Sequence, residues 1–333
     1  MSASSKIYTH DFYSIKMFSI FDLKLGKMSM KCNTFLVLML VISSVAYGQS
    51  DLFLTQQWFS RINMNPAATG NSNNVDVFLL NRQQWVGFDN APKTSILNAH
   101  SYFNSIQSGL GFSLMFDKVG VSHKATNAMF SYAYHVDFSD EILLSLGLSG
   151  GLYNSHWDPK KNIFPEDGSK IDPEQSVDKT SRTSADFDAG VELNGYGFTF
   201  GLSAAHLLSS SPEKAYTGKP GRSFYSYVRY LRSIDRSFDI APGIMYRNSN
   251  HSNFFDFNVT AYYLKKYWAG IAFRPDNACA VMLGAEFNMF RVGYSYDRSV
   301  GKTSSLAANT HEIMLSVRIQ KPQKGRKTTR FLD

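Results

Sequence analysis

The sequence predicts an all-β fold, a transmembrane outer-membrane β-barrel of about 14 antiparallel strands with both termini in the periplasm. Three observations predict it: long segments in which apolar residues alternate with small or polar ones, an excess of aromatic residues over charge, and an alternation of short and long connections. Charged residues make up 18% of the 333, against about 25% in an average soluble domain. The 26 Phe and 18 Tyr suit the aromatic girdles that such a barrel carries at the two membrane interfaces.

The first part of the chain is predicted to direct export. Two lysines precede an apolar run over residues 35–45, and small residues follow up to Gly48. This is the layout of a secretory signal, and the run is shorter than the roughly 20 residues that a membrane-spanning helix needs. We therefore assign residues 28–48 to a signal peptide cleaved near Gly48, and residues 1–27 to an extension of the gene model.

Residues 49–73 are predicted to form a periplasmic segment that leads into the barrel. Asn65, Pro66 and Gly70 are turn residues, because proline fixes φ and glycine permits left-handed backbone geometry. We expect them to have a structural role only. The barrel itself is predicted over residues 74–319, followed by a basic tail over residues 320–333.

Alternation is clear in the segment that starts at Ile142. Leu144, Leu146 and Leu148 alternate with Ser145 and Gly147. A period of two places the two sets on opposite faces of a strand, so we expect leucines toward lipid and small residues toward a wet lumen. The predicted strands begin near Asn74, Thr94, Gly109, Lys124, Asp140, Arg182, Gly195, Arg222, Ser237, Asn253, Tyr267, Asn277, Phe290 and Asn309.

The connections between these strands differ in length in a regular way. Tight turns follow residues 138, 194, 233, 264 and 287, whereas residues 154–181, 208–221 and 299–309 form long polar loops. Short turns at one end and long loops at the other are typical of outer-membrane barrels, in which the long loops face outside.

Catalytic and metal-binding patterns are weak. Residues 147–151 fit G-x-S-x-G with Ser149 as nucleophile, but that motif requires a sharp turn from a strand into a helix, and here it lies within a long alternating strand. The histidines lack a metal-binding spacing, and the acidic residues between Asp167 and Glu174 lack the order of a calcium-binding loop. We therefore predict no enzyme, no cofactor and no metal.

The formal net charge of +7 does not indicate nucleic-acid binding, because the cations are scattered rather than gathered in one patch, apart from those in the tail. Anionic lipid headgroups or an acidic envelope partner suit this charge better. Of the two cysteines, Cys32 lies in the segment expected to be removed, so only Cys279 remains and no disulfide is predicted.

The candidate interaction residues lie between the first two predicted strands. Trp85, Gly87, Phe88 and Pro92 form an unusually apolar loop. Exposed aromatic groups of this kind usually either pack within the protein or bind a partner. The two alternatives are a segment that plugs the mouth of the barrel and a surface that contacts another protein.

Three ordered motifs give a family resemblance: N-P-A-A-T-G at residues 65–70, N-R-Q-Q-W-V-G-F-D-N-A-P-K-T at residues 81–94, and G-L-G-F-S-L-M-F-D-K-V-G-V-S from Gly109. In these motifs the chain resembles the PorP/SprF family, outer-membrane proteins linked to the type IX secretion and gliding machinery of Bacteroidetes.

The resemblance implies a non-enzymatic barrel in the outer membrane of a Gram-negative bacterium. Such a barrel would help to deliver or anchor exported proteins, for example adhesins, at the cell surface. Its implied partners are outer-membrane lipid, type IX secretion components and the C-terminal domain of a secreted cargo. Two alternatives stay open from the residues: a channel for small or hydrophobic solutes, since about 14 strands leave room for a lumen, and a lipase that would use Ser149.

Overall fold

The computed structural model describes residues 53–158, 180–208, 220–249, 252–275, 277–300 and 309–321. The expected gene-model extension, the signal peptide, the acidic segment 167–174 and the tail beyond residue 321 lie outside these ranges. Within the described ranges, no helix has both the length and the apolar character needed to cross a membrane.

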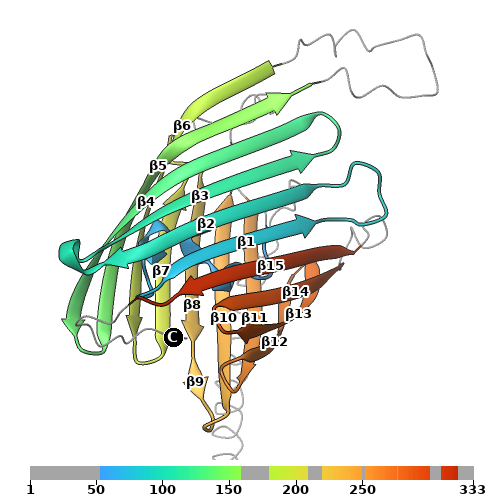
Figure 1. Ribbon diagram of the computed structural model, residues 1–333. Coiled ribbons are helices and arrows are strands. Elements are labelled where there is room, and N and C mark those ends of the chain that lie inside the picture. The colour runs from blue at the N-terminus through green and yellow to red at the C-terminus, as the bar shows by residue number, and fades with distance from the viewer. Residues whose placement is uncertain are drawn as a thin grey trace, which may run out of the picture. The chain divides into compact units, whose positions relative to one another are not determined.

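The described residues form one antiparallel sheet that closes into a barrel (Figure 1). Its strands are β1 (Val75–Gln83), β2 (Lys93–Phe103), β3 (Ser108–Val119), β4 (His123–Ser139), β5 (Ile142–Trp157), β6 (Thr180–Gly195), β7 (Phe198–Ala205), β8 (Ser223–Tyr230), β9 (Arg232–Ser233), β10 (Phe238–Ser249), β11 (Ser252–Tyr263), β12 (Tyr267–Arg274), β13 (Ala278–Phe287), β14 (Phe290–Ser299) and β15 (Thr310–Ile319).

Closure comes from the pairing of the first strand with the last. β1 pairs with β15 from Val75↔Ile319 to Gln83↔His311, and the other strands, apart from β8 and β9, pair with their neighbours along the chain. β8 and β9 both pair with β10, so the fifteen described strands occupy fourteen positions in the wall. The predicted fold class is therefore confirmed.

The predicted strand starts agree closely with the observed ones. The largest difference is at β7, which was expected from Gly195 and begins at Phe198. The pairing of Val75 with Ile319 places both ends of the barrel wall at the same end of the barrel. That this end faces the periplasm stays a prediction.

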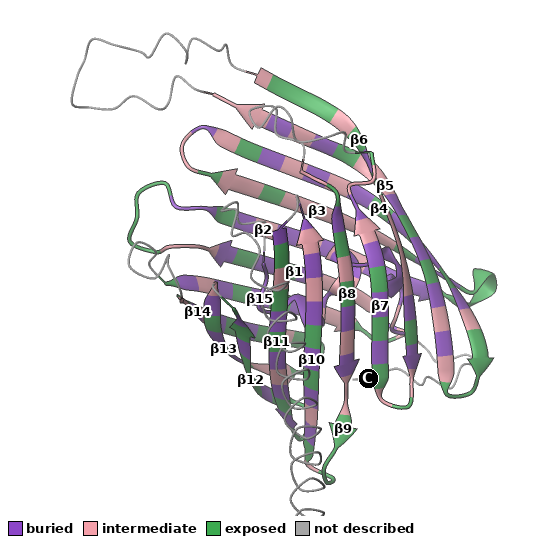
Figure 2. Ribbon diagram, turned by 180° about the vertical axis from the view of Figure 1, so that it is seen from behind, coloured by how far each residue is buried: buried purple, intermediate pink, exposed green. Residues whose placement is uncertain are grey.

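The two faces of the wall differ in the way that the alternation predicts (Figure 2). On β5, Leu146 and Leu148 are 48% and 63% exposed on the outside, whereas Ser145 and Ser149 are 1% and 5% exposed on the inside. An apolar outer face on an edgeless barrel is the surface that a lipid environment requires, since every strand finds its backbone partners in the wall.

Residues 53–72, which fall within the predicted periplasmic segment, lie inside the barrel. We call these residues the N-terminal plug. The plug contains three short 3-10 helices, η1 (Gln57–Phe59), η2 (Arg61–Asn63) and η3 (Pro66–Ala68), and most of its residues are buried. It is bonded to strands on several sides of the wall, for example at Asn98 on β2, Glu192 on β6 and Glu312 on β15.

The motif at residues 65–70 shapes the plug. The Asn65 side chain caps η3 by accepting a hydrogen bond from the Ala67 backbone N–H at 2.9 Å, and Pro66 takes the first helical position, where its missing N–H costs nothing. Gly70 has φ +68° and lies against the Gly109 backbone of β3, where an added Cβ would be 2.5 Å from the Gly109 Cα. These turn residues therefore direct the chain inside the barrel before it enters β1.

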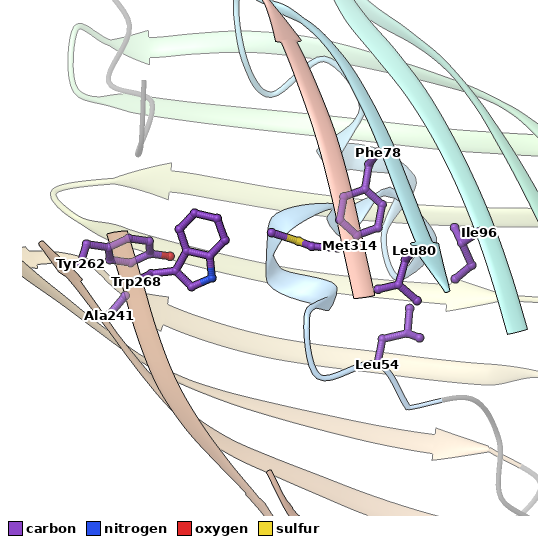
Figure 3. Close-up of a cluster of buried hydrophobic side chains, with 8 residues drawn as sticks. All are labelled: Leu54, Phe78, Leu80, Ile96, Ala241, Tyr262, Trp268 and Met314. Atoms are coloured by element: carbon purple, nitrogen blue, oxygen red, sulfur yellow. The ribbon is translucent and has the colours of Figure 1, made fainter. Parts of the chain in front are cut away.

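Part of the lumen beside the plug is filled by apolar side chains rather than by the polar residues expected of a wet interior. Leu54 of the plug belongs to a buried apolar cluster with inward-facing side chains of the wall (Figure 3). Those side chains are Phe78, Leu80, Ile96, Ala241, Tyr262, Trp268 and Met314. β2 alternates poorly in polarity because its inward-facing Ile96 packs in this cluster rather than facing water.

Gly147 on β5 shows how closely the plug approaches the wall. A Cβ at this position would overlap the backbone of Pro66 and Ala67 in η3. Only a residue without a side chain fits here, so the run of small residues on the inner face of β5 leaves room for the plug.

We predict that Gly147→Ala lowers the stability of the folded barrel by about 1–3 kcal/mol, the usual cost of overpacking a filled interior. Gly150→Ala, three residues along the same strand, is the matched control, because the atoms nearest to its methyl group belong to the Phe187 side chain, at 3.1 Å, rather than to the backbone. Urea unfolding in detergent, followed by the heat-dependent shift in gel mobility of the folded barrel, measures the difference. Equal midpoints for the two variants would contradict this close packing.

Candidate functional site

The interior of the barrel carries a buried network of charged side chains at the start of the plug. Arg82 of β1 forms ion pairs with Asp297 of β14, at 2.9 Å, and with Glu312 of β15. Arg274 of β12 forms ion pairs with Asp256 of β11, at 2.6 Å, and with Asp297, at 3.1 Å. We call these five residues the anchor network.

Thr55 connects the plug to this network. Its backbone N–H donates to the two Glu312 carboxylate oxygens at 2.8 and 3.0 Å, and its hydroxyl donates to Asp297 at 2.8 Å. Arg274 in turn donates from Nη2 to the Thr55 hydroxyl oxygen at 2.9 Å. The plug therefore supplies donors to carboxylates that would otherwise be only partly compensated in a buried place.

Because the anchor network is shielded from water, each of its charged groups needs its ion-pair and hydrogen-bond partners. The side chains of Arg274, Asp256 and Asp297 are 3%, 2% and 2% exposed. Burying such ions costs more than their attraction returns unless hydrogen bonds satisfy the remaining donors and acceptors. The backbone and hydroxyl of Thr55 provide part of that satisfaction, so the plug and the network stabilise one another.

A second ion pair holds the middle of the plug. Arg61 donates to both Glu192 oxygens, from Nε and Nη2 at 3.0 Å each, and this is the bidentate geometry that gives guanidinium–carboxylate pairs their strength. Tyr227 of β8 donates to Glu192 at 2.5 Å and accepts from Asn65 Nδ2 at 3.1 Å. Glu192 is fully buried.

Cation–π contacts add to the hold on the plug from another part of the wall. The Arg229 guanidinium lies 5.2 Å from the Trp58 ring, and that of Arg247 lies 5.5 Å from the Phe53 ring. Such contacts are worth more when desolvated, as these arginines are. The plug is thus fixed at its start, its middle and its aromatic side chains.

The predicted interaction residues lie together in the connection from β1 to β2, residues 84–92, which we call the rim loop. Trp85 and Gly87 have positive φ, +47° and +110°. The Val86 N–H donates to the Asn309 carbonyl at 2.8 Å, which ties the loop to the chain entering β15. Phe88 is 54% exposed, whereas Pro92 is buried.

The rim loop is not the segment that fills the lumen. That place is taken by the N-terminal plug, and Phe88 and the neighbouring Val86, 38% exposed, present apolar surface to the outside of the protein. Both alternatives for this loop, packing at the mouth of the barrel and contact with a partner, stay predictions. Trp85 is half-buried, which suits a role in shaping the loop.

Ser149 does not lie in a nucleophile elbow. It is within β5, which continues to Trp157, and its hydroxyl oxygen is 2.6 Å from that of Ser131 on β4. His135, which lies opposite Ser145 on β5, is bonded to Ser145, at 2.7 Å, and to the Thr69 carbonyl, at 2.9 Å. These bonds are structural links within the wall and to the plug.

The anchor network and Glu192 were not identified as site residues from the sequence. One signal was available: Glu192 and Glu312 fall on the inner face of strands whose outer face is apolar. An inward-facing charge in a barrel wall requires a partner, but the partner strand lies far away in the chain, Asp297 and Arg82 being 215 residues apart.

We predict that Arg274→Met destabilises the folded barrel by about 3–5 kcal/mol, because it removes the counter-charge of buried Asp256 and leaves Asp297 with Arg82 alone. Arg298→Met is the control, since Arg298 is an exposed arginine on β14. Unfolding midpoints of the purified proteins in detergent measure the effect. If the Arg274→Met variant proved as stable as the control, the ion pairs would not be what holds the structure together.

Comparisons with solved structures find outer-membrane proteins of low sequence identity. Three of them are the monoaromatic hydrocarbon channel CymD, the toluene transporter TbuX of Ralstonia pickettii and the outer membrane protein Omp33 of Acinetobacter baumannii. Their sequence identities are 10%, 8% and 8%, and their TM-scores are 0.49, 0.48 and 0.44. The alignments cover 83%, 78% and 75% of this chain and 95%, 93% and 99% of the other chains.

None of the curated proteins is significantly similar to the chain. The family model described as type IX secretion system membrane protein PorP/SprF matches residues 46–317, which include the plug, the rim loop and nearly all of the barrel wall. The chain therefore belongs to the PorP/SprF family of type IX secretion system membrane proteins.

Proposed function

We propose that the protein is a non-enzymatic component of the type IX secretion system that helps to deliver or anchor exported proteins, such as adhesins, at the cell surface. The observation that carries the proposal is the filled lumen. A barrel whose interior is occupied by its own anchored N-terminal plug suits a rigid scaffold in the outer membrane, with its two ends as working surfaces.

The rim loop is the surface that best fits a secreted partner. It lies at the same end of the barrel as the long connections that follow β5, β7 and β14. In the proposed topology this end faces outside, where the C-terminal domain of a cargo protein would arrive. Exposed Val86 and Phe88 offer an apolar contact of the kind that dominates binding energy when a partner covers it.

The opposite end of the barrel carries tight turns and would face the other type IX secretion components in the periplasm. Those turns are the connections after β2, β4, β6, β9, β11 and β13. The apolar outer wall between the two ends would contact outer-membrane lipid, after export and cleavage of the signal peptide near Gly48. The barrel would thus link the secretion machinery inside the envelope to a cargo outside it.

The alternative function, a channel for small or hydrophobic solutes, requires a continuous path through the lumen. The plug occupies that path, and it is bonded to β2, β6 and β15. We predict that the full-length barrel gives little or no conductance in a planar bilayer and that deletion of residues 53–64 raises it severalfold. A large, stable conductance of the intact protein would support the channel instead.

We predict that cells lacking the gene release into the medium an exported protein that the wild type retains on its surface. A gene carrying Val86→Ser with Phe88→Ser should restore retention only in part, because the apolar contact is lost. Asp89→Asn, in the same loop, is the control and should restore retention fully. Quantitative comparison of the surface and medium fractions measures this, and unchanged retention in the gene deletion would exclude the anchoring role.

A further inference from the structure

A group of metal-ligating side chains lies where β7 ends beside the longer β6. The last paired residues of these two strands are Ala189 and Ala204. Asp186 and Asp188 come just before Ala189 on β6, and His206 follows the end of β7. None of its members belongs to the anchor network or to the rim loop.

The geometry brings three ligands, two carboxylates and one imidazole, within reach of one ion. His206 Nδ1 is 2.7 Å from Asp186 Oδ2, and the His206 backbone N–H donates to Asp188 Oδ1 at 2.8 Å. One ligand-capable atom from each of the three side chains lies within 4.8 Å of the others. Ligands at about 2.0–2.1 Å from a tetrahedral ion are about 3.3 Å apart, so small side-chain rotations would suffice.

A second observation is independent of these contacts. Asn127 of β4 is 9% exposed and lies with Nδ2 3.3 Å from Asp186 Oδ2. Its carbonyl oxygen Oδ1 has no hydrogen-bond partner among the described residues. A buried carbonyl without a partner is costly, and the two ends of an amide exchange places by a simple flip of the side chain. With Oδ1 turned toward Asp186, the amide would offer a fourth ligand.

The group is open to an interior space. A cavity of about 190 Å³ between the plug and the wall is lined by Asn127, Asp188 and His206, together with Tyr153. This space can admit a hydrated ion, and it can also supply a water ligand. The site is therefore partly buried and still accessible for exchange.

We propose that Asp186, Asp188, His206 and Asn127 form a binding site for a divalent transition-metal ion of the Zn²⁺ class. An imidazole with two carboxylates suits Zn²⁺, whereas Ca²⁺ takes oxygen ligands alone. The ion joins β4, β6 and the end of β7. It thus reinforces the wall at the place where β6 extends beyond β7. It also gives the Asp186 carboxylate and the Asn127 carbonyl oxygen one cation to which both can bind.

The test uses the full-length protein, folded in detergent and stripped of metal with a chelator. Equilibrium dialysis against Zn²⁺ should give one bound ion per barrel, and Co²⁺ should give the intense visible absorption of a tetrahedral N/O site. The double variant Asp186→Asn with His206→Gln should weaken Zn²⁺ binding at least tenfold. The matched control, Glu141→Gln with His311→Gln, changes one acid and one histidine elsewhere and should leave binding unchanged.

Asn127→Asp provides an independent check, because it replaces the neutral ligand with an anionic one in the same place and should tighten Zn²⁺ binding. Zn²⁺ should also raise the unfolding temperature of the wild type and of the control, but not that of the double variant, since a ligand stabilises only the state that binds it. Gel mobility of the unheated samples shows that each variant is folded. Absence of Zn²⁺ binding, equal binding by the double variant, or tighter binding of Ca²⁺ than of Zn²⁺ would overturn the proposal.

Discussion

The structure depends on the compensation of charge inside a closed wall. Asp256, Asp297 and Glu312 line the lumen with little exposure to solvent, and two arginines from the wall and one threonine from the plug provide their donors. Because an uncompensated buried charge is so costly, the wall and the plug are each incomplete without the other. The same principle explains the Arg61–Glu192 pair, in which the cation comes from the plug and the anion from the wall.

Because the plug fills the lumen, the residues on the inner face of the barrel have to complement its side chains in size and polarity. A water-filled lumen would accept polar side chains throughout, whereas this lumen contains apolar clusters around Leu54 and Trp58, small residues such as Gly147 beneath η3, and ion pairs such as Arg61–Glu192. The inner face therefore packs against the plug as a protein core does, and hydrogen bonds and ion pairs hold the two together. A barrel of this kind is rigid, which suits a scaffold that positions partners at its two ends.

The presence of the plug in the lumen also determines where apolar side chains stay exposed. With the lumen filled, exposed apolar groups are left on the outer wall and in connections between strands, among them Val86 and Phe88 of the rim loop and Ile234 and Leu264 at the opposite end. For the wall surface, the proposed partner is outer-membrane lipid. The rim loop lies beyond this surface, and its backbone is held by a bond from Val86 to Asn309. Its exposed Val86 and Phe88 are the basis on which we propose it as a surface for another protein.

The sequence by itself determined the barrel, its strand positions and its family. Period-two alternation indicates which side of the wall each residue faces, and turn residues and loop lengths are local properties of the sequence. Strands such as β5 and β15 could therefore be recognised from their own residues. The placement of residues 53–72 in the lumen was decided only by the tertiary structure. A short segment rich in turns has the same local signature whether it lies in water or inside a barrel, and the partners that bury it, such as Glu192 and Glu312, lie 131 and 257 residues away. Pairing across such separations leaves no periodic trace in a single sequence, because it is a property of the closed wall.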